Sequence, residues 1–466
     1  MATVTLDTTT SYQTITAWEA THQAGESSKL PDETVEYPST TFPNYKAELL
    51  TDLLDLGINR IRIEMRYDDV NATGYSISSP YPNAIQPSTA TAGQFHYDRI
   101  DQSMDAWVTD YRDALIARGE TLHINLCFVD FRSAGYQAEA VATEAALLIK
   151  NGVQHFYTTY GYLPNSIEPC LEPDNQTGGA WTAARLANII VQARSDLAAL
   201  DTGGSPGYGS IPFIAPSTVA IAVAPTWWSD MKTAQASIPS LVSEFNYHSY
   251  DTPSNTERGD VLTAANADGV KTSMLEYIGA TYDMLYADLV HAKVSSWQQF
   301  TTAYTYVGWT DNGAEYFTIN TTTWAVTPTA RTKWLRHLFK YVRRGAVRKA
   351  ASCPTAGFTE PLAFQNTNGS VVMVLRNTLS GSIDVAGLPA GTYGINYSYG
   401  SSANTSTDPT TYNSSFANQT ITAGQSVSFT MADAGIVTVY DVNYLTRPIP
   451  FNKLRRRSPK GTFYRP

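Results

Sequence analysis

The chain has 466 residues, of which 43% are hydrophobic and 16% are charged, and its formal net charge is −10. This size and composition indicate a globular protein with a large core and two or three domains. The negative charge, with no basic stripe through the body of the chain, excludes nucleic acid as the main partner. No apolar run reaches the length of a membrane span.

The motifs that mark metal or cofactor sites are missing from the sequence. The three cysteines, Cys127, Cys170 and Cys353, are widely spaced and form neither a disulfide framework nor a zinc pattern. The sequence has no HExxH, phosphate-binding loop, nucleotide glycine motif or G-x-S-x-G elbow, and its seven histidines are scattered. We therefore expect no metal and no organic cofactor.

The start of the chain, MATVTLDTTT, has neither the charged nor the apolar region of a signal peptide. The composition is rich in Thr, Ser, Asn and Tyr and poor in Lys, as in extracellular proteins. We expect a secreted or periplasmic protein whose leader has been removed. The sequence does not predict its oligomeric state.

In chain order, a first strand within residues 1–14 is expected to join a distant β domain. From residue 15 to 350, short β-like runs alternate with amphipathic segments such as YKAELLTDLLDLG. Eight such alternations predict a (β/α)8 barrel, and a doubly wound open sheet is the competing architecture. The absence of a glycine fingerprint after the first strand favours the barrel. The expected strands cover residues 15–21, 59–65, 122–129, 166–172, 211–218, 242–250, 272–278 and 292–300.

The texture changes after a last helix at residues 329–349. Residues 351–447 contain short strands separated by Gly, Asn and Pro turns, which is typical of an antiparallel β-sandwich. Residues 448–466, which include KLRRRSPK, read as a solvated basic tail. The fold class is therefore α/β, a (β/α)8 barrel followed by a β-sandwich.

Two glutamates are expected at the carboxyl ends of barrel strands, where the active sites of such barrels lie. Glu172 ends the fourth strand and Glu276 ends the seventh, and their spacing fits about three β/α units. Two facing carboxylates about 5–5.5 Å apart suit retaining glycoside hydrolysis. The alternative for Glu172, in CLEPDNQT, is a carboxylate that caps a turn.

The second strand, NRIRIEMR, carries charge on one face and apolar side chains on the other. Because the apolar face must meet the helices, Arg60, Arg62 and Glu64 are expected inside the barrel. An inward arginine can hold a catalytic carboxylate ionised. The alternative is a purely structural layer of ion pairs, and both readings can hold at different heights.

Further polar and aromatic residues are expected around the same rim. The sixth strand ends FNYHSYD, where His248 and Tyr250 share one face, and a tyrosine there can hydrogen-bond a nucleophilic carboxylate. Several tryptophans around one rim suggest a platform for sugar rings, although each can equally be a core residue. They are Trp18 and Trp297 on the first and eighth strands, and Trp227, Trp228 and Trp309 in loops.

These residues resemble the clan A retaining glycoside hydrolases. The Glu-Pro pair after strand four, the H-x-Y of strand six, the Glu of strand seven and the Trp of strand eight are similar to that clan's motifs. The helix WLRHLFKYVRRGAVRK leading to VVMVLRN looks most like glycoside hydrolase family 30, with families 39 and 79 as near relatives. The resemblance covers residues 1–445 through short motifs.

The resemblance implies a retaining β-glycosidase with a carbohydrate substrate and no cofactor. It implies that Glu172 is the acid/base and Glu276 the nucleophile. It also implies that Arg62 and Tyr250 steady the nucleophile, His248 lines the sugar site and Trp297 stacks on the reacting sugar.

The sequence departs from the clan at Leu171, where the usual residue is an Asn that hydrogen-bonds the sugar 2-hydroxyl. Asn175 and Asn125 are possible substitutes for it. The other functional readings are a non-catalytic carbohydrate-binding relative and a structural or adhesive surface protein.

Overall fold

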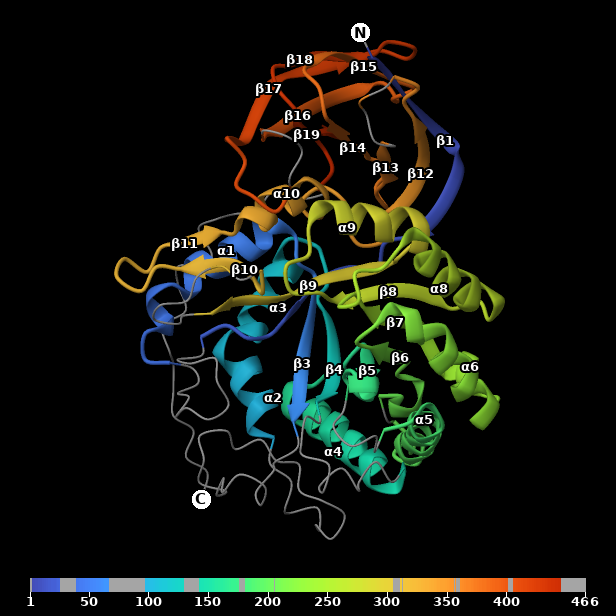
Figure 1. Ribbon diagram of the computed structural model, residues 1–466. Coiled ribbons are helices and arrows are strands. Elements are labelled where there is room, and N and C mark those ends of the chain that lie inside the picture. Colours follow the sequence, from blue (N-terminus) through green and yellow to red (C-terminus); the bar gives the residue numbers. More distant parts are fainter. Residues whose placement is uncertain are drawn as a thin grey trace.

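The computed structural model describes residues 2–25, 39–66, 97–129, 142–175, 181–204, 206–304, 311, 313–355, 357, 361–400 and 405–445. Figure 1 shows two parts, a barrel surrounded by helices and a β-sandwich stacked on it. Trp309 and the basic tail at residues 448–466 lie outside the described residues. Among those residues, no helix combines the length and apolar character needed to cross a bilayer.

The barrel is a closed ring of eight parallel strands, so the predicted fold class is confirmed and the open sheet is excluded. The closure comes from pairing of the last strand with both the first and the seventh, for example Trp18 with Trp297 and Met274 with Trp297. The eight strands are β2 (Ala17–Thr21), β3 (Arg60–Arg66), β4 (His123–Val129), β5 (Ser166–Glu168), β6 (Phe213–Thr218), β7 (Val242–His248), β8 (Lys271–Glu276) and β9 (Ser296–Tyr304).

Two short strands extend the barrel sheet beyond β9. β10 (Glu315–Ile319) runs parallel to β9, and β11 (Val326–Pro328) pairs antiparallel with β10. They lead into α10, which Figure 1 shows between the barrel and the sandwich.

Amphipathic helices cover the outside of the barrel because their apolar faces must be buried. In α1 (Lys46–Leu56) five leucines are buried, and the helix ends at Gly57, whose φ of 98° suits a residue without a Cβ. The other helices are α2 (Asp98–Ser103), α3 (Thr109–Ala117), α4 (Ala142–Tyr160), α5 (Ala183–Ala198), α6 (Ala224–Ala234), α7 (Ile238–Leu241), α8 (Asn255–Ala267), α9 (Tyr282–Ala287) and α10 (Ala330–Phe339).

The second sheet has nine strands and includes the N-terminal strand β1, which the blue ribbon in Figure 1 shows among the orange and red strands. β1 pairs antiparallel with β12 and parallel with β15. The strands are β1 (Ala2–Thr14), β12 (Val347–Ser352), β13 (Leu362–Gln365), β14 (Val371–Asn377), β15 (Gly381–Ala386), β16 (Gly391–Tyr399), β17 (Thr411–Ile421), β18 (Val427–Met431) and β19 (Gly435–Asp441).

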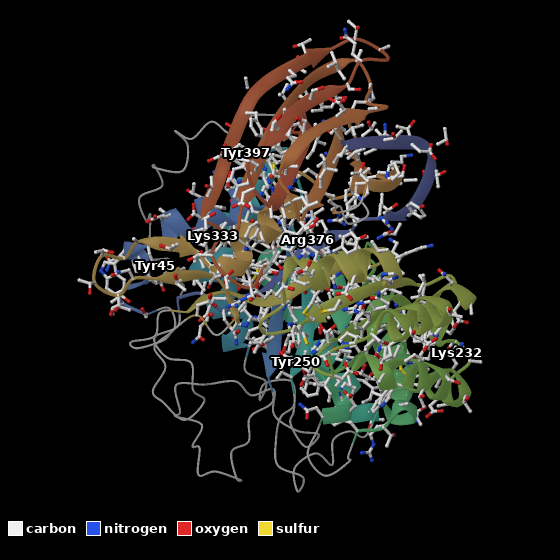
Figure 2. The ribbon with its side chains drawn as sticks, turned by 45° about the horizontal axis from the view of Figure 1, so that its top comes forward. Tyr45, Lys232, Tyr250, Lys333, Arg376 and Tyr397 are labelled. Carbon is white, nitrogen blue, oxygen red and sulfur yellow. The ribbon has the colours of Figure 1, made fainter. Side chains whose placement is uncertain are left out.

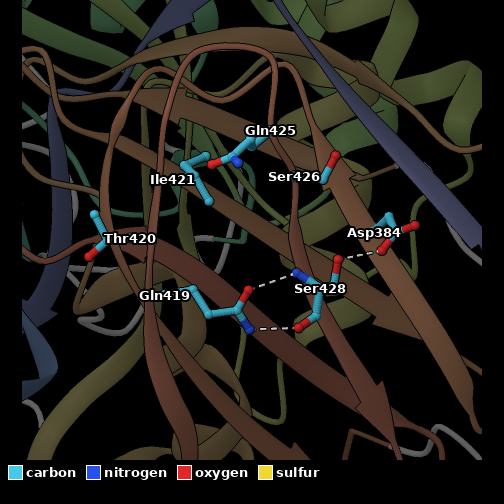
Figure 3. A pocket seen from close by; sticks show the side chains of 7 residues that line it. All are labelled: Asp384, Gln419, Thr420, Ile421, Gln425, Ser426 and Ser428. Carbon is cyan, nitrogen blue, oxygen red and sulfur yellow. Dashed lines mark hydrogen bonds between the residues drawn. The ribbon is translucent and has the colours of Figure 1, made fainter.

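The two edge strands of this sheet, β17 and β18, are joined by a side chain. Gln419 on β17 donates to the carbonyl of Ser428 at 2.6 Å and accepts from its N–H at 2.9 Å. Figure 3 shows these bonds in a cleft of about 530 Å³. The glutamine amide satisfies backbone groups of an edge strand that would otherwise be open to another chain.

The barrel and the sandwich share one hydrophobic core. Residues of β13, β14 and β19 belong to the same buried cluster as the barrel and α10. His337 of α10 is hydrogen-bonded to both Thr438 and Ser398 of the sandwich at 2.9 Å. Burial lowers the pKa of His337 to about 3, so the imidazole is neutral at this interface.

Candidate active site

Glu276 is the last residue of β8, and two donors hold its carboxylate. Arg62 of β3 forms an ion pair with one oxygen, and the Tyr250 hydroxyl donates to the other at 2.9 Å. Tyr250 follows β7 and is labelled on the barrel side of the molecule in Figure 2. Burial and the negative charge of Glu276 raise the pKa of Tyr250, so its hydroxyl stays protonated and donates.

Arg62 is fully buried, so its charge depends on its partner. Burial disfavours the guanidinium, but the charge of Glu276 outweighs this and keeps the pKa of Arg62 well above its usual value. The arginine also lies over the ring of Phe300 of β9, 5.8 Å from its centroid. A buried arginine paired in this way fixes the position of the Glu276 carboxylate.

Glu172 lies beyond β5, in the loop that enters the short 3₁₀ turn Pro173–Asn175. Its φ of 46° is a left-handed conformation, which costs a non-glycine residue about 1–3 kcal/mol. The conformation is held because the Glu172 N–H donates to the Ser217 carbonyl at 2.9 Å and its carbonyl accepts from the Asn175 N–H at 3.0 Å. The backbone therefore turns the Glu172 side chain to a fixed position.

The Glu172 carboxylate is bound by His248 and Asn175. Nδ1 of His248 lies 2.8 Å from one oxygen, and the Asn175 side-chain amide donates to the other at 2.9 Å. Burial raises the pKa of Glu172, but the hydrogen bond and charge of His248 outweigh it, and the net pKa is lowered. Burial lowers the pKa of His248, but Glu276 and Glu172 outweigh it, and the net pKa is raised. The two groups form an ion pair that shares one proton.

The two predicted carboxylates lie close together. One oxygen each from Glu172 and Glu276 and one ring nitrogen of His248 all lie within 4.8 Å of one another, and all three residues are buried. This set is also the one among the described residues that could ligate a metal ion. Because the Arg62 guanidinium is paired with Glu276, a cation there would meet a positive charge already in place.

A second group of polar side chains, centred on Glu168, lies inside the barrel below Glu172 and Glu276. Glu168 of β5 accepts from Ser217 and, at 3.0 and 3.3 Å, from the amides of Asn125 and Asn246. The Ser217 N–H in turn donates to Asn246 at 2.9 Å. Asn125 is thus used inside the barrel, and it does not replace the missing Asn beside Glu172. We did not anticipate Glu168 and Ser217, although the period of two in β5 places Glu168 on the inner face.

One side of the barrel mouth is apolar. Leu171 packs against Cys127 and Val129, both of β4, in a small buried cluster. Cys127 is close enough to Glu168 and Arg62 for their charges to affect it, and burial, followed by Glu168, raises its pKa well above the usual value. The Leu171 side chain is a hydrocarbon, so it cannot donate to a sugar hydroxyl as the side chain of an Asn at this position would.

The predicted tryptophan platform is wrong for three of its five members. Trp18 and Trp297 are fully buried and contact Phe339 of α10, on the helix side of the barrel wall. Their indole N–H groups donate to the Val342 carbonyl at 2.7 Å and to Asp288 at 2.9 Å. Trp297 is the second residue of β9, so it lies near the start of the strand and not at its rim end.

Trp228 and Trp227 belong to α6. Trp228 stacks on Phe245 and donates to Asp268 at 2.7 Å, so it is also a core residue. Trp227 is partly buried and packs against the barrel core. Tyr277, the residue after Glu276, packs next to Tyr250, with 5.4 Å between the two ring centroids.

Several solved structures that align with this chain are glycoside hydrolases. The catalytic domain of family 30 xylanase C from Talaromyces cellulolyticus aligns with a TM-score of 0.64 at 17% identity, over 94% of this chain and 99% of that chain. A family 30 endoxylanase from Clostridium papyrosolvens aligns with a TM-score of 0.62 at 16% identity, over 94% and 99%. An endo-β-1,6-glucanase aligns with a TM-score of 0.60 at 14% identity, over 94% and 93%.

No protein-family model matches the sequence, and no curated protein matches it. The resemblance to glycoside hydrolase family 30 is therefore confirmed for the fold, in a chain whose sequence has diverged far from these structures. The chain shares the fold of these structures, a barrel joined to a β-sandwich.

Proposed function

We propose that this protein is a retaining β-glycoside hydrolase that cleaves a polysaccharide or an oligosaccharide by double displacement. The observation that carries the proposal is the approach of Glu172 and Glu276 to within 4.8 Å, with different partners on each. Retaining enzymes hold their two carboxyl groups about 5–5.5 Å apart, whereas inverting enzymes hold them about 6.5–9.5 Å apart to admit a water.

In the first step, a Glu276 oxygen attacks the anomeric carbon and forms a glycosyl ester while the bond to the leaving oxygen breaks. Arg62 and Tyr250 hold and orient the Glu276 carboxylate before the attack. Glu172 gives a proton to the leaving oxygen. That proton comes from the pair with His248, whose Nδ1 is 2.8 Å from the Glu172 carboxylate.

In the second step, Glu172 takes a proton from a water, and the water oxygen attacks the anomeric carbon. The ester bond breaks and Glu276 leaves as a carboxylate. The proton returns to the pair of Glu172 and His248, which is then ready for another cycle. Two inversions at one carbon give net retention.

The substrate class is taken from the enzymes that share the fold. Two of them are xylanases and one is an endo-β-1,6-glucanase. We propose a β-linked glycan for this chain. We also propose action outside the cytoplasm, since another structure with this fold, at a TM-score of 0.62, is described as a conserved exported protein from Bacteroides fragilis.

The alternative is a non-catalytic carbohydrate-binding relative. Leu171 favours it, because hydrogen bonds to the sugar 2-hydroxyl supply several kcal/mol in the transition state of such enzymes. A binder would bind glycans without any turnover.

A screen of polysaccharides and aryl β-glycosides separates the two functions. We expect turnover by the wild type and a loss of at least about 10⁴-fold in Glu276→Ala, measured per folded molecule because the change leaves the buried Arg62 without its partner. Glu48→Gln, an exposed carboxylate on α1, is the matched control and should keep full activity.

Azide then assigns the two roles. In Glu276→Ala, azide replaces the nucleophile and should give a glycosyl azide of inverted configuration. In Glu172→Ala, azide attacks the glycosyl ester and should give a glycosyl azide of retained configuration.

Near-normal turnover by Glu276→Ala would show that the nucleophile is another residue. Inverted hydrolysis by the wild type would rule out double displacement, and glycan binding without turnover would favour the binder.

A further inference from the structure

A cavity of about 180 Å³ lies where the base of the barrel meets the sandwich. Its walls come from the residues just before β3 and β4, from the segment after α10, and from the turn between β13 and β14. The carboxylates Glu172 and Glu276 lie at the carboxyl ends of the strands, so this cavity is at the opposite end of the barrel.

The cavity is rich in positive charge. Three arginines line it, Arg118, Arg343 and Arg344, and one carboxylate, Glu120, lies among them. Glu120 accepts from Arg343 Nε at 2.6 Å and forms an ion pair with Arg118. Glu120 therefore pairs with two of the three guanidinium groups, those of Arg118 and Arg343.

Nearby positive charge contributes to lowered pKa values at two of these arginines, Arg118 and Arg344. Burial and the nearby charge of Arg343 lower the pKa of Arg118 despite its contact with Glu120. Burial and the charge of Arg60 lower the pKa of Arg344. An added anion would relieve this repulsion.

One strong donor at the cavity has no partner among the described residues. Arg343 is only 6% exposed, and its Nη2 makes no hydrogen bond there, although its Nη1 donates to the Phe339 carbonyl at 3.1 Å. A buried donor left without an acceptor destabilises the protein, and a bound anion would supply that acceptor. Arg344 is exposed, and among the described residues its guanidinium donates one hydrogen bond, to Thr121 at 3.2 Å, so its other donors can meet a ligand.

We propose that this junction cavity binds the oxyanion group of a ligand, with Arg343 and Arg344 as its donors. Planar guanidinium groups bind phosphate, sulfate and carboxylate oxygens in pairs of parallel hydrogen bonds. Because one water takes about 30 Å³ in the liquid, the cavity has room for an oxyanion and a few further groups. Two sources have this chemistry: a free inorganic oxyanion, and the carboxylate of an acidic sugar. The site is independent of any reaction at Glu172 and Glu276.

The proposal is tested with the full chain by calorimetric titration and thermal unfolding at constant ionic strength. The probes are inorganic phosphate and glucuronate, with glucose as the uncharged control. We expect saturable binding of at least one anion, a rise in unfolding temperature on its addition, and no effect of glucose. Tighter binding of phosphate assigns a free oxyanion, and tighter binding of glucuronate assigns an acidic sugar.

Variants locate the site. Arg344→Gln should weaken the anion about tenfold or more, since a hydrogen bond to a charged group is lost. Arg343→Gln should do the same, and the exposed Arg344 carries the test alone if Arg343→Gln fails to fold. Arg194→Gln, a partly buried arginine on α5 that donates to the Ile211 carbonyl, is the matched control and should bind like the wild type. No saturable binding of either anion, or unchanged affinity in Arg344→Gln, would overturn the proposal.

Discussion

Arg60 and Arg62 lie two residues apart on β3, point to the same side and are both fully buried, yet they have different partners. Arg60 forms ion pairs at 2.8 Å with Glu19 of β2 and Glu244 near the start of β7. Arg62 pairs with Glu276 at the end of β8. The two-residue repeat of a β-strand therefore separates Arg60, which supports the inside of the barrel, from Arg62, which lies beside the proposed nucleophile. Height along the strand, and not residue type, distinguishes the two arginines.

The layer deep in the barrel, formed by Arg60, Glu19 and Glu244, stabilises the fold. Burial raises the pKa of Glu19 to about 7 even though the charge of Arg60 opposes the rise. The pKa of Glu244, also buried, is lowered because Arg60 and its hydrogen bond outweigh burial. Arg60 thus offsets the cost of two buried acids at once.

Replacing each arginine by Met separates the two layers and has the largest expected effect. Arg60→Met should lower the free energy of unfolding by about 3–5 kcal/mol, because it leaves buried carboxylates without their partner. Its activity per folded molecule should remain close to that of the wild type. Arg62→Met should lower kcat on the order of 10²–10³-fold, as expected when a donor is lost beside charge that changes in the reaction.

Urea unfolding and kcat on the same preparations provide the measurement. Equal losses of kcat in both variants would show that height along β3 does not separate support from catalysis.

His248, the partner of Glu172, lies with Arg62 and Glu276 at the mouth of the barrel. We expect it to control the loss of activity at alkaline pH. The pKa of His248 is raised, so its pair with Glu172 keeps the shared proton below that pKa and loses it as the pH rises through it. In His248→Asn the proton must reside on Glu172 alone, and the alkaline limb of kcat/KM should move to lower pH.

The contribution of the His248–Glu172 pair to the free energy of unfolding depends on pH in the same direction. The raised pKa of His248 gives stability that is fully present below the unfolded value of about 6.5 and is lost above the folded pKa. His123→Asn is the control, since His123 lies at the start of β4 and burial holds its pKa well below the usual value. An unmoved alkaline limb in His248→Asn would contradict a shared proton.

The smallest expected effect comes from the second donor to Glu276. Tyr250→Phe removes the 2.9 Å hydrogen bond to the carboxylate and should lower kcat/KM roughly tenfold, which corresponds to about 1.5 kcal/mol. Tyr247→Phe is the matched control, because its hydroxyl donates to Asp288 at 3.2 Å, away from both glutamates. If both variants lose activity equally, the bond from Tyr250 has no special role.

The strand pattern was predictable because short β-like runs, buried on both faces in the barrel, alternate with amphipathic helical segments. All eight expected barrel strands coincide with strands of the closed sheet, shifted by a few residues at their ends. The largest shift is in the eighth strand, which begins at Ser296 and runs to Tyr304. That shift moved the expected rim away from Trp297.

The sequence itself contains the reason why the prediction for Trp18 was wrong. In β2, Glu19 points into the barrel and pairs with Arg60, so its neighbour Trp18 must point out to the helices. The argument from alternating faces that placed Arg62 inside would have placed Trp18 outside.

By itself, the sequence determined the alternation of strands and helices, the inward arginines of β3, and Glu276 at the end of β8; Glu172, expected at the end of the fourth strand, lies beyond β5 in a loop. These follow from local periodicity, which burial imposes on each element separately. The tertiary structure decided which acid pairs with which arginine, the support of Glu172 by Ser217 and His248, and the apolar contact of Leu171 with Cys127 and Val129. Those contacts join residues from different strands, and closure of the barrel sets their distances.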